Sequence, residues 1–235
     1  MLKNKSFFIG IDLGWKEKKT TGVCIAAENN CLKCADIFGK DVLRFISPYL
    51  KNTEVIAIDA PLTKGRGKGK MRLYEKFLST SIFRQARVNP TPPALMPKLC
   101  ETAQEVVRKL DKRRFALGIN LIETFSNLVE KICRESFFLK CPSCQTENQP
   151  FGKLRVMASL PNHQESASIC ARVAFLHSRF KTRYLGYKDG FLFLPEMSFW
   201  KIGWKKKFYQ AWKNRPRLKY YRLITNIFTP LEVCR

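Results

Sequence analysis

The fold of this chain is decided by two short stretches, FFIGIDLG at residues 7–14 and VIAIDAPL at residues 55–62. Each is a run of mainly apolar residues with one aspartate near its end, Asp12 in the first and Asp59 in the second. Apolar runs of this length predict strands that are buried on both faces of a sheet. A third run ends on Glu123. We therefore expect three buried strands whose acidic ends emerge at one edge of the sheet.

Hydrophobic periodicity predicts the remaining elements. Because three antiparallel strands precede alternating helices and strands, we expect a mixed α/β sheet flanked by helices. The expected strands cover residues 6–13, 20–27, 31–38, 55–58, 119–123 and 191–194, and the expected helices cover residues 41–50, 70–82, 97–113, 126–135 and 163–180.

Two of these helices carry local signals. Ser126 is a favoured residue type for capping the start of a helix. The helix at residues 163–180 carries the small residues Ala167, Ala171 and Ala174. We expect these to let it pack closely on its neighbours.

The composition is that of a basic globular protein. Hydrophobic residues make up 45% of the 235 residues, which is enough for a packed core. Lys and Arg number 43 against 19 Asp and Glu, and the resulting net charge of +24 attracts polyanions. Nucleic acid is the partner that we expect, with an acidic protein or an anionic lipid surface as alternatives.

The location that the sequence predicts is the cytoplasm. The apolar stretch near the basic N-terminus stops at Asp12, which is too short for a signal peptide, and no run approaches the roughly 18 apolar residues of a membrane span. The nine cysteines are scattered, which favours reduced thiols over a disulfide framework.

The three strand-end acids predict a site for a hard divalent cation. Carboxylates are the ligands that Mg²⁺ prefers in proteins. We expect Asp12 and Asp59 to hold Mg²⁺ or Mn²⁺ and Glu123 to complete the ligand shell. The alternative is that each aspartate only caps the turn after its strand.

A Gly-rich basic loop follows the second of these strands. Glycines alternate there with cations, which lets the backbone approach a ligand closely while the side chains meet phosphates. The alternative is a solvated loop, and the loop lacks the Gly-Lys-Ser/Thr ending of a Walker motif. The expected substrate-binding cations are Lys64, Arg66, Lys68 and Lys70, with Arg72 just beyond.

Two C-x-x-C pairs predict a zinc site. Cys31 and Cys34 form one pair and Cys141 and Cys144 the other, and four thiolates suit tetrahedral Zn²⁺. The alternative is that the first pair falls in a strand by chance. His163 starts a predicted helix, where it is either catalytic or structural.

The last 40 residues differ in composition from the rest, so we divide the chain into residues 1–195 and a basic, aromatic extension at 196–235. An aromatic stripe recurs there at four-residue steps, which predicts a helix. This stripe suits stacking on single-stranded bases, contact with a membrane surface, or packing on the core. Its members are Trp200, Trp204, Phe208 and Trp212.

Several motifs of the first part resemble a known family. GIDLG at 10–14 followed by TGV at 21–23 resembles the first hairpin of ribonuclease H-like proteins. Over residues 6–195, the order and spacing of the motifs resemble the family catalogued as domain of unknown function 429, regarded as predicted nucleases of the ribonuclease H-like fold. These further motifs are IDAPL at 58–62, MRLYE at 71–75, PPALM at 92–96, LIETF at 121–125 and GFLFLP at 190–195.

The resemblance implies a ribonuclease H-like sheet with magnesium held by Asp12, Asp59 and Glu123. It also implies that Arg72 and Glu75 border the site. The family's last helix usually brings a further aspartate, and Ser166 stands at that position. Either Glu165 substitutes as a catalytic acid from the neighbouring position, or the site is weakened. Adjacent helical residues differ by about 100° in direction, so Glu165 does not simply replace residue 166.

These observations lead to three hypotheses about function. The first is a metal-dependent nuclease that hydrolyses phosphodiester bonds. The second, favoured by Ser166, is a nucleic-acid-binding protein of the same fold that has lost turnover. The third is an ATPase of the actin or sugar-kinase type, but the second Gly-rich phosphate motif of that class is absent from the sequence.

Overall fold

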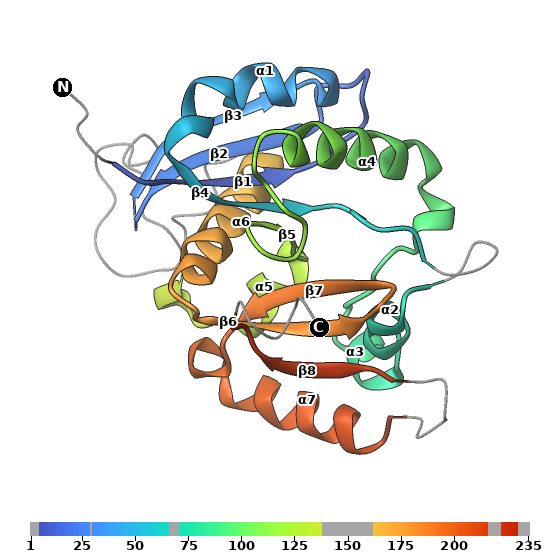
Figure 1. The fold of residues 1–235 in the computed structure, drawn as a ribbon. Coiled ribbons are helices and arrows are strands. Elements are labelled where there is room, and N and C mark those ends of the chain that lie inside the picture. Colours follow the sequence, from blue (N-terminus) through green and yellow to red (C-terminus); the bar gives the residue numbers. More distant parts are fainter. Residues whose placement is uncertain (1–4, 29, 66–70, 138–161, 216–221, 230–235) are drawn as a thin grey trace.

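The computed structural model describes residues 5–28, 30–65, 71–137, 162–215 and 222–229. They contain one eight-stranded mixed sheet with the strand order β3-β2-β1-β4-β5-β7-β6-β8 (Figure 1). β1 is parallel to β4, β4 to β5 and β5 to β7, whereas β2, β3, β6 and β8 pair antiparallel with their neighbours. The strands are β1 (Phe7–Asp12), β2 (Thr21–Ala27), β3 (Asn30–Ile37), β4 (Thr53–Asp59), β5 (Leu121–Glu123), β6 (Thr182–Tyr187), β7 (Gly190–Pro195) and β8 (Ile224–Ile227).

Helices cover both faces of the sheet, as the alternation along β1 requires. Ile9 and Ile11 pack in the cluster that contains α1 (Val42–Ile46) and α4 (Pro97–Asp111). Phe8 lies in the opposite cluster, which contains α5 (Ser126–Ile132) and α6 (Asn162–Ser178). The mixed α/β sheet predicted from the sequence is therefore present, with a separate hydrophobic cluster on each face.

Helix α6 approaches the sheet unusually closely, because glycines lie beneath it. A Cβ atom at Gly10 would lie 1.9 Å from the carbonyl oxygen of Ala167, and one at Gly22 would lie 1.9 Å from that of His163. Ala167 and Ala171 are buried at this contact, as their small size predicted. Gly10 therefore allows α6 to pack closely on β1, and the contact at Gly22 fixes the position of His163.

The helical segments differ from the prediction in detail. The expected helix at 41–50 is α1 between two 3-10 segments, Gly39–Asp41 and Ser47–Asn52, with Pro48 near the start of the second. The expected helix at 70–82 is divided into α2 (Leu73–Leu78) and α3 (Ser81–Gln85). Further 3-10 turns occur at Pro93–Leu95, Glu135–Phe137 and Met197–Phe199. Within the described ranges, no helix is long and apolar enough to cross a bilayer.

The C-terminal extension is part of the same core. β8 pairs with β6, and neither strand was predicted. Helix α7 (Ile202–Lys213) carries three members of the predicted stripe, whereas Trp200 precedes the helix and follows the 3-10 turn Met197–Phe199. Trp200 and Phe208 are buried, and Trp204 and Trp212 pack against the same cluster. Of the three readings of this stripe, the structure supports packing on the core.

Candidate active site

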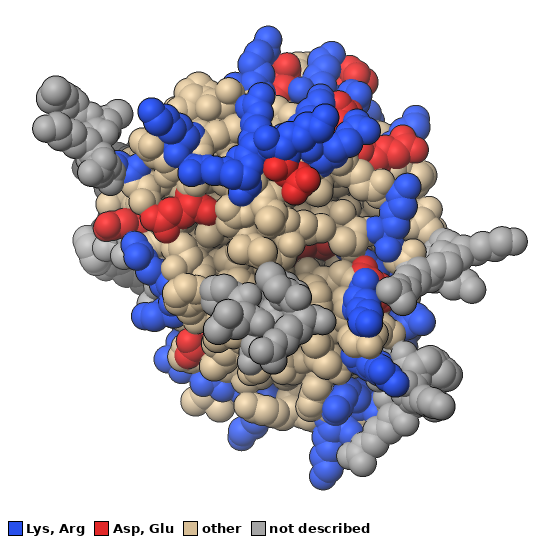
Figure 2. Space-filling view, viewed as in Figure 1, with Lys and Arg blue, Asp and Glu red and all other residues tan. Residues whose placement is uncertain are grey.

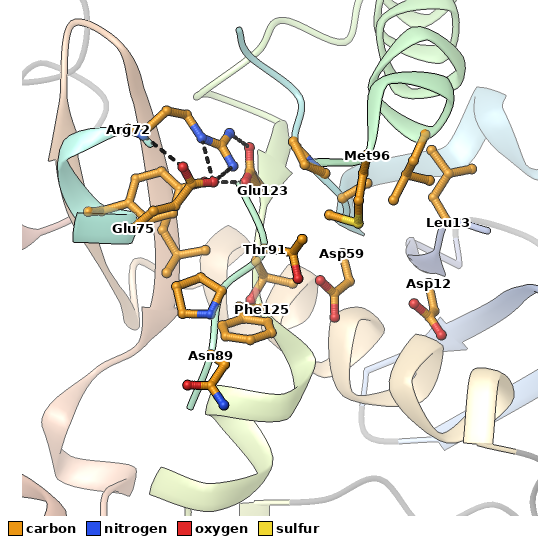
Figure 3. A pocket seen from close by; sticks show the side chains of 17 residues that line it. Asp12, Leu13, Asp59, Arg72, Glu75, Asn89, Thr91, Met96, Glu123 and Phe125 are labelled. Carbon is orange, nitrogen blue, oxygen red and sulfur yellow. Dashed lines mark hydrogen bonds and ion pairs between the residues drawn. The ribbon is translucent and has the colours of Figure 1, made fainter. Parts of the chain in front are cut away.

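Two carboxylates lie side by side at the carboxyl edge of the sheet. Asp12 ends β1, Asp59 ends β4, and the two are register partners in the parallel ladder. They continue the rows of Phe8 and Ala57, which face the α6 side, so both side chains project from the same face. Figure 3 shows both carboxyl groups at one side of a pocket. The predicted meeting of the first two acids is therefore present.

Helix α6 supplies an imidazole to the first carboxylate. His163 Nδ1 lies 2.9 Å from Asp12 Oδ2. His163 keeps 44% of its side-chain surface exposed and Asp12 keeps 22%. The tight contact between His163 and Gly22 holds the start of α6 against β2. This pair is thus both fixed by packing and open to a ligand.

Helix α5 holds the second carboxylate. The backbone N–H of Ser126 donates to Asp59 Oδ2 at 2.9 Å, and the Ser126 hydroxyl donates to the same oxygen. Ser126 is the first residue of α5 and Phe125 occupies the cap position, so the predicted capping role of Ser126 is wrong. Its hydroxyl orients Asp59 instead.

The electrostatics of this pair favour protonation when no cation is present. Burial raises the pKa of Asp59 to about 7, with a further contribution from the negative charge of Asp12. Burial also raises the pKa of Asp12, against the opposing effect of His163. A cation placed between these oxygens would offset both the burial and the repulsion.

The pocket beside the pair has a volume of about 210 Å³. Its wall combines polar groups with apolar surface, which includes Met96, Leu99 and Phe125. Asn89 and Thr91 add polar groups to this wall. The pocket therefore offers a ligand both polar and apolar contacts beside the two carboxylates.

Glu123 does not join the pair, contrary to the expected three-acid site. Its register partner on β4 is Ile58, which faces the α4 side of the sheet. Side chains at paired positions of adjacent strands share a face, so Glu123 points away from the face of Asp59. Among the described residues, the three acids do not form a group whose ligand atoms lie within 4.8 Å of one another.

A buried ion-pair cluster holds Glu123 instead. Arg72 Nη1 donates to Glu123 Oε2 at 2.8 Å, and its Nε donates to Glu75 Oε1 at 3.0 Å. The Tyr74 hydroxyl and the Leu62 N–H also donate to Glu123. Figure 3 shows this cluster across the pocket from Asp59.

The same cluster changes the interpretation of Arg72, which the sequence suggested as a phosphate ligand. Its side chain is only 2% exposed, and both carboxylates that it contacts are buried. Its guanidinium is occupied by ion pairs and by a hydrogen bond to Thr63. Arg72 and Glu75 do border the pocket, as the family resemblance implied.

Glu165 does not reach the two aspartates either. The acid whose charge raises its pKa, after burial, is Glu130 of α5. Two helical steps turn a side chain by about 200°, so Glu165 points away from His163 on the same helix. His163 is thus the α6 side chain that contacts Asp12.

The basic loop and the cysteines are described only in part. Lys64 is exposed, whereas Arg66, Lys68, Lys70, Cys141 and Cys144 lie outside the described residues. Cys31 and Cys34 lie together with Cys24, which belongs to no C-x-x-C pair. Figure 2 shows many Lys and Arg side chains over α1 and α4 at the top of the view, with acidic side chains among them.

Comparison with models of known families, with curated proteins and with solved structures gave no match.

Proposed function

We propose that this protein is a divalent-metal-dependent nuclease that hydrolyses phosphodiester bonds, with Asp12 and Asp59 as the metal ligands. The observation that carries the proposal is the register pairing of these two acids on one face, with an imidazole beside the first. The net charge of +24 supports a polyanionic substrate.

The donor set fits Mg²⁺ or Mn²⁺. Magnesium usually takes one or two carboxylates and completes its shell with water and substrate phosphate oxygens. Two aspartates therefore suffice, although Glu123 lies elsewhere. The raised pKa of Asp59 has the same implication, since a cation relieves the repulsion that produces part of it.

A bound cation would supply Lewis-acid stabilisation of the phosphate and a more acidic bound water. The residues of the chain would prepare this site. Ser126 fixes Asp59 through two hydrogen bonds, so the carboxylate is oriented before a ligand arrives. His163 is partly exposed and hydrogen-bonded to Asp12, where it can accept a proton from water or donate one to a leaving oxygen.

The strand order supports a ribonuclease H-like interpretation of the fold. β3, β2 and β1 are antiparallel neighbours, and β4 and β5 continue the sheet in parallel. This is the arrangement that the sequence resemblance implied for residues 6–195. We keep both that fold and the family membership as proposals.

The second candidate function is nucleic-acid binding without turnover. The observation that favours it is the separation of Glu123 from the two aspartates, together with Ser166 where the family has an acid. A site with two acids in place of three or four would bind a cation more weakly and stabilise less transition-state charge.

One experiment separates the two candidates. Purified protein is incubated with single- and double-stranded DNA and RNA in Mn²⁺, in Mg²⁺ and in chelator, and binding is followed in parallel by fluorescence anisotropy. We expect metal-dependent cleavage that Asp12→Asn and Asp59→Asn abolish, while Asp111→Asn, an exposed acid at the end of α4, leaves it intact. Binding with no cleavage in any metal would support the second candidate, and neither binding nor cleavage would contradict both.

A further inference from the structure

Three cysteine side chains meet on β2 and β3, the two strands at one edge of the sheet. Cys24 lies on β2, and Cys31 and Cys34 lie on β3. The sulfur atoms of Cys24 and Cys31 are 3.6 Å apart, those of Cys31 and Cys34 are 3.1 Å apart, and all three lie within 4.8 Å of one another. Among the described residues, this is the one cluster of three or more His, Cys, Asp or Glu side chains with that spacing.

A β-bulge creates this cluster. In a regular strand, residues three positions apart face opposite sides, so Cys31 and Cys34 would diverge. Here Lys33 pairs with Ile25 and Cys31 pairs with Ala26, which leaves Leu32 as the extra residue. A bulge of this kind reverses the alternation. It brings Cys31 to the face of Cys34, whose direct partner across the ladder is Cys24.

The cluster is buried on one side and accessible to solvent on the other. Cys24 and Cys31 are buried against Ala167 and Ala171 of α6, whereas Cys34 is partly exposed. Because the alanine side chains are small, the sulfur atoms are the largest side-chain atoms at this contact. An ion could enter on the side of Cys34.

We infer that Cys24, Cys31 and Cys34 form a binding site for a thiophilic metal ion of the Zn²⁺ class. Two thiolate sulfurs that each lie about 2.3 Å from one tetrahedral ion are about 3.8 Å apart. The 3.6 Å between Cys24 and Cys31 lies close to this value, whereas the 3.1 Å between Cys31 and Cys34 must widen when an ion binds, which the partly exposed Cys34 side chain allows. The cluster offers sulfur and no carboxylate, so its chemistry excludes the hard cation proposed for the aspartates.

This site differs from the zinc site that the sequence predicted. Cys24 is a ligand that no C-x-x-C motif indicates, and three thiolates form a complete set for an ion that keeps one position for an external ligand. Cys141 and Cys144 are not part of the inference. The site also shares no ligand with the proposed nuclease site, since neither aspartate nor His163 belongs to the cysteine cluster.

The test uses the reduced full-length protein, first stripped of metal and then titrated with Co²⁺, whose thiolate charge-transfer absorption reports sulfur ligation. Zinc in the freshly purified protein is measured by mass spectrometry. We expect one equivalent of Co²⁺ to bind with thiolate absorption and Zn²⁺ to displace it. Removal of one of three ligands should weaken binding by at least about 100-fold, because even an outer-shell change costs 10- to 100-fold.

Matched variants keep the inference falsifiable. Cys34→Ser, at the partly exposed position, and Cys24→Ala should both lose the absorption, whereas Cys100→Ser on α4 and Asp12→Asn should retain it. Circular dichroism checks that each variant is folded, and Cys34→Ser alone decides if Cys24→Ala does not fold. The inference is overturned by absence of Co²⁺ binding, by a Cys31–Cys34 disulfide that accounts for both thiols in the purified protein, by a signal that survives Cys34→Ser, or by a signal that only Cys141→Ser or Cys144→Ser removes.

Discussion

Glu123 is the register partner of Ile58, one position before Asp59 on β4. This single step places its carboxylate on the opposite face of the sheet from that of Asp59. The edge therefore carries two acids that face α6 and a third that forms an ion pair with Arg72. Substitution of the two aspartates should therefore change ligand binding, whereas substitution of Arg72 should change stability.

Arg72→Met should destabilise the fold. The substitution leaves Glu75 and Glu123 buried without their cation, and breaking a buried ion pair in this way costs about 3–5 kcal/mol. Urea unfolding measures the loss, with Arg84→Met at an exposed position of α3 as the control. Unchanged stability together with weaker nucleic-acid binding would instead support the phosphate-binding role suggested by the sequence.

In the metal-free protein, Asp59→Asn should be more stable than wild type at pH 8, and this advantage should be smaller at pH 5. The folded protein keeps the Asp59 proton up to about pH 7, whereas the unfolded chain loses it near 3.8, so wild-type stability falls as the pH rises between these values. Asparagine can still accept both hydrogen bonds from Ser126 and removes this penalty, which is on the order of 4 kcal/mol above pH 7 because the pKa is raised from 3.8 to about 7. Thermal unfolding in chelator at the two pH values measures the difference.

The metal provides the complementary control for this prediction. Added Mn²⁺ should raise the melting temperature of wild type at pH 8 and leave that of Asp59→Asn nearly unchanged, since a ligand that binds only the folded state stabilises it. A variant whose stability follows the same pH curve as wild type would contradict the assignment of the raised pKa.

His177→Gln should flatten the acid side of the stability curve. His177 is buried, where its Nε2–H donates to the carbonyl of Ile119 at 2.8 Å and its Nδ1 accepts from the Thr182 hydroxyl. Burial lowers its pKa from 6.5 to about 4, so wild-type stability is lost as the pH falls from 6.5 toward 4. Unfolding free energies at pH 7 and pH 4.5 measure this slope, and an equal slope in the variant would refute the cause.

Gly22→Ala should disrupt the packing of the start of α6 on β2. The added Cβ would lie 1.9 Å from the carbonyl oxygen of His163, so the helix must shift, at a cost of about 3 kcal/mol or more. Cation binding at Asp12 should weaken as well, because His163 moves with the helix. Gly203→Ala is the matched control, since nothing lies within 4 Å of its Cβ position in α7 and alanine there should stabilise by up to about 1 kcal/mol.

Much of the fold followed from local patterns. The apolar runs at 7–12 and 53–59 are buried strands, and the small residues of α6 are buried against the sheet. β6 and β8 escaped prediction for different reasons. β6 follows α6 after a short turn without a clear alternation, and β8 is a partly exposed edge strand of four residues.

The candidate site could be predicted only in part. That Asp12 and Asp59 end neighbouring buried strands is visible in the sequence. The role of Ser126 is not, because the same serine that suits a helix cap also suits a hydrogen bond to a carboxylate. The membership of Cys24 in a thiol cluster depends on a bulge at Leu32, and no spacing along the chain reveals it.

The amino-acid sequence alone determined which segments become buried strands and which of these end on acids, since burial and alternation are local properties of the chain. Only the tertiary structure decided the register between strands and the contacts of α6 with the sheet. A change of register by one residue moves a side chain to the other face. For that reason Asp59 lies beside Asp12, which contacts His163, while Glu123 is paired with Arg72.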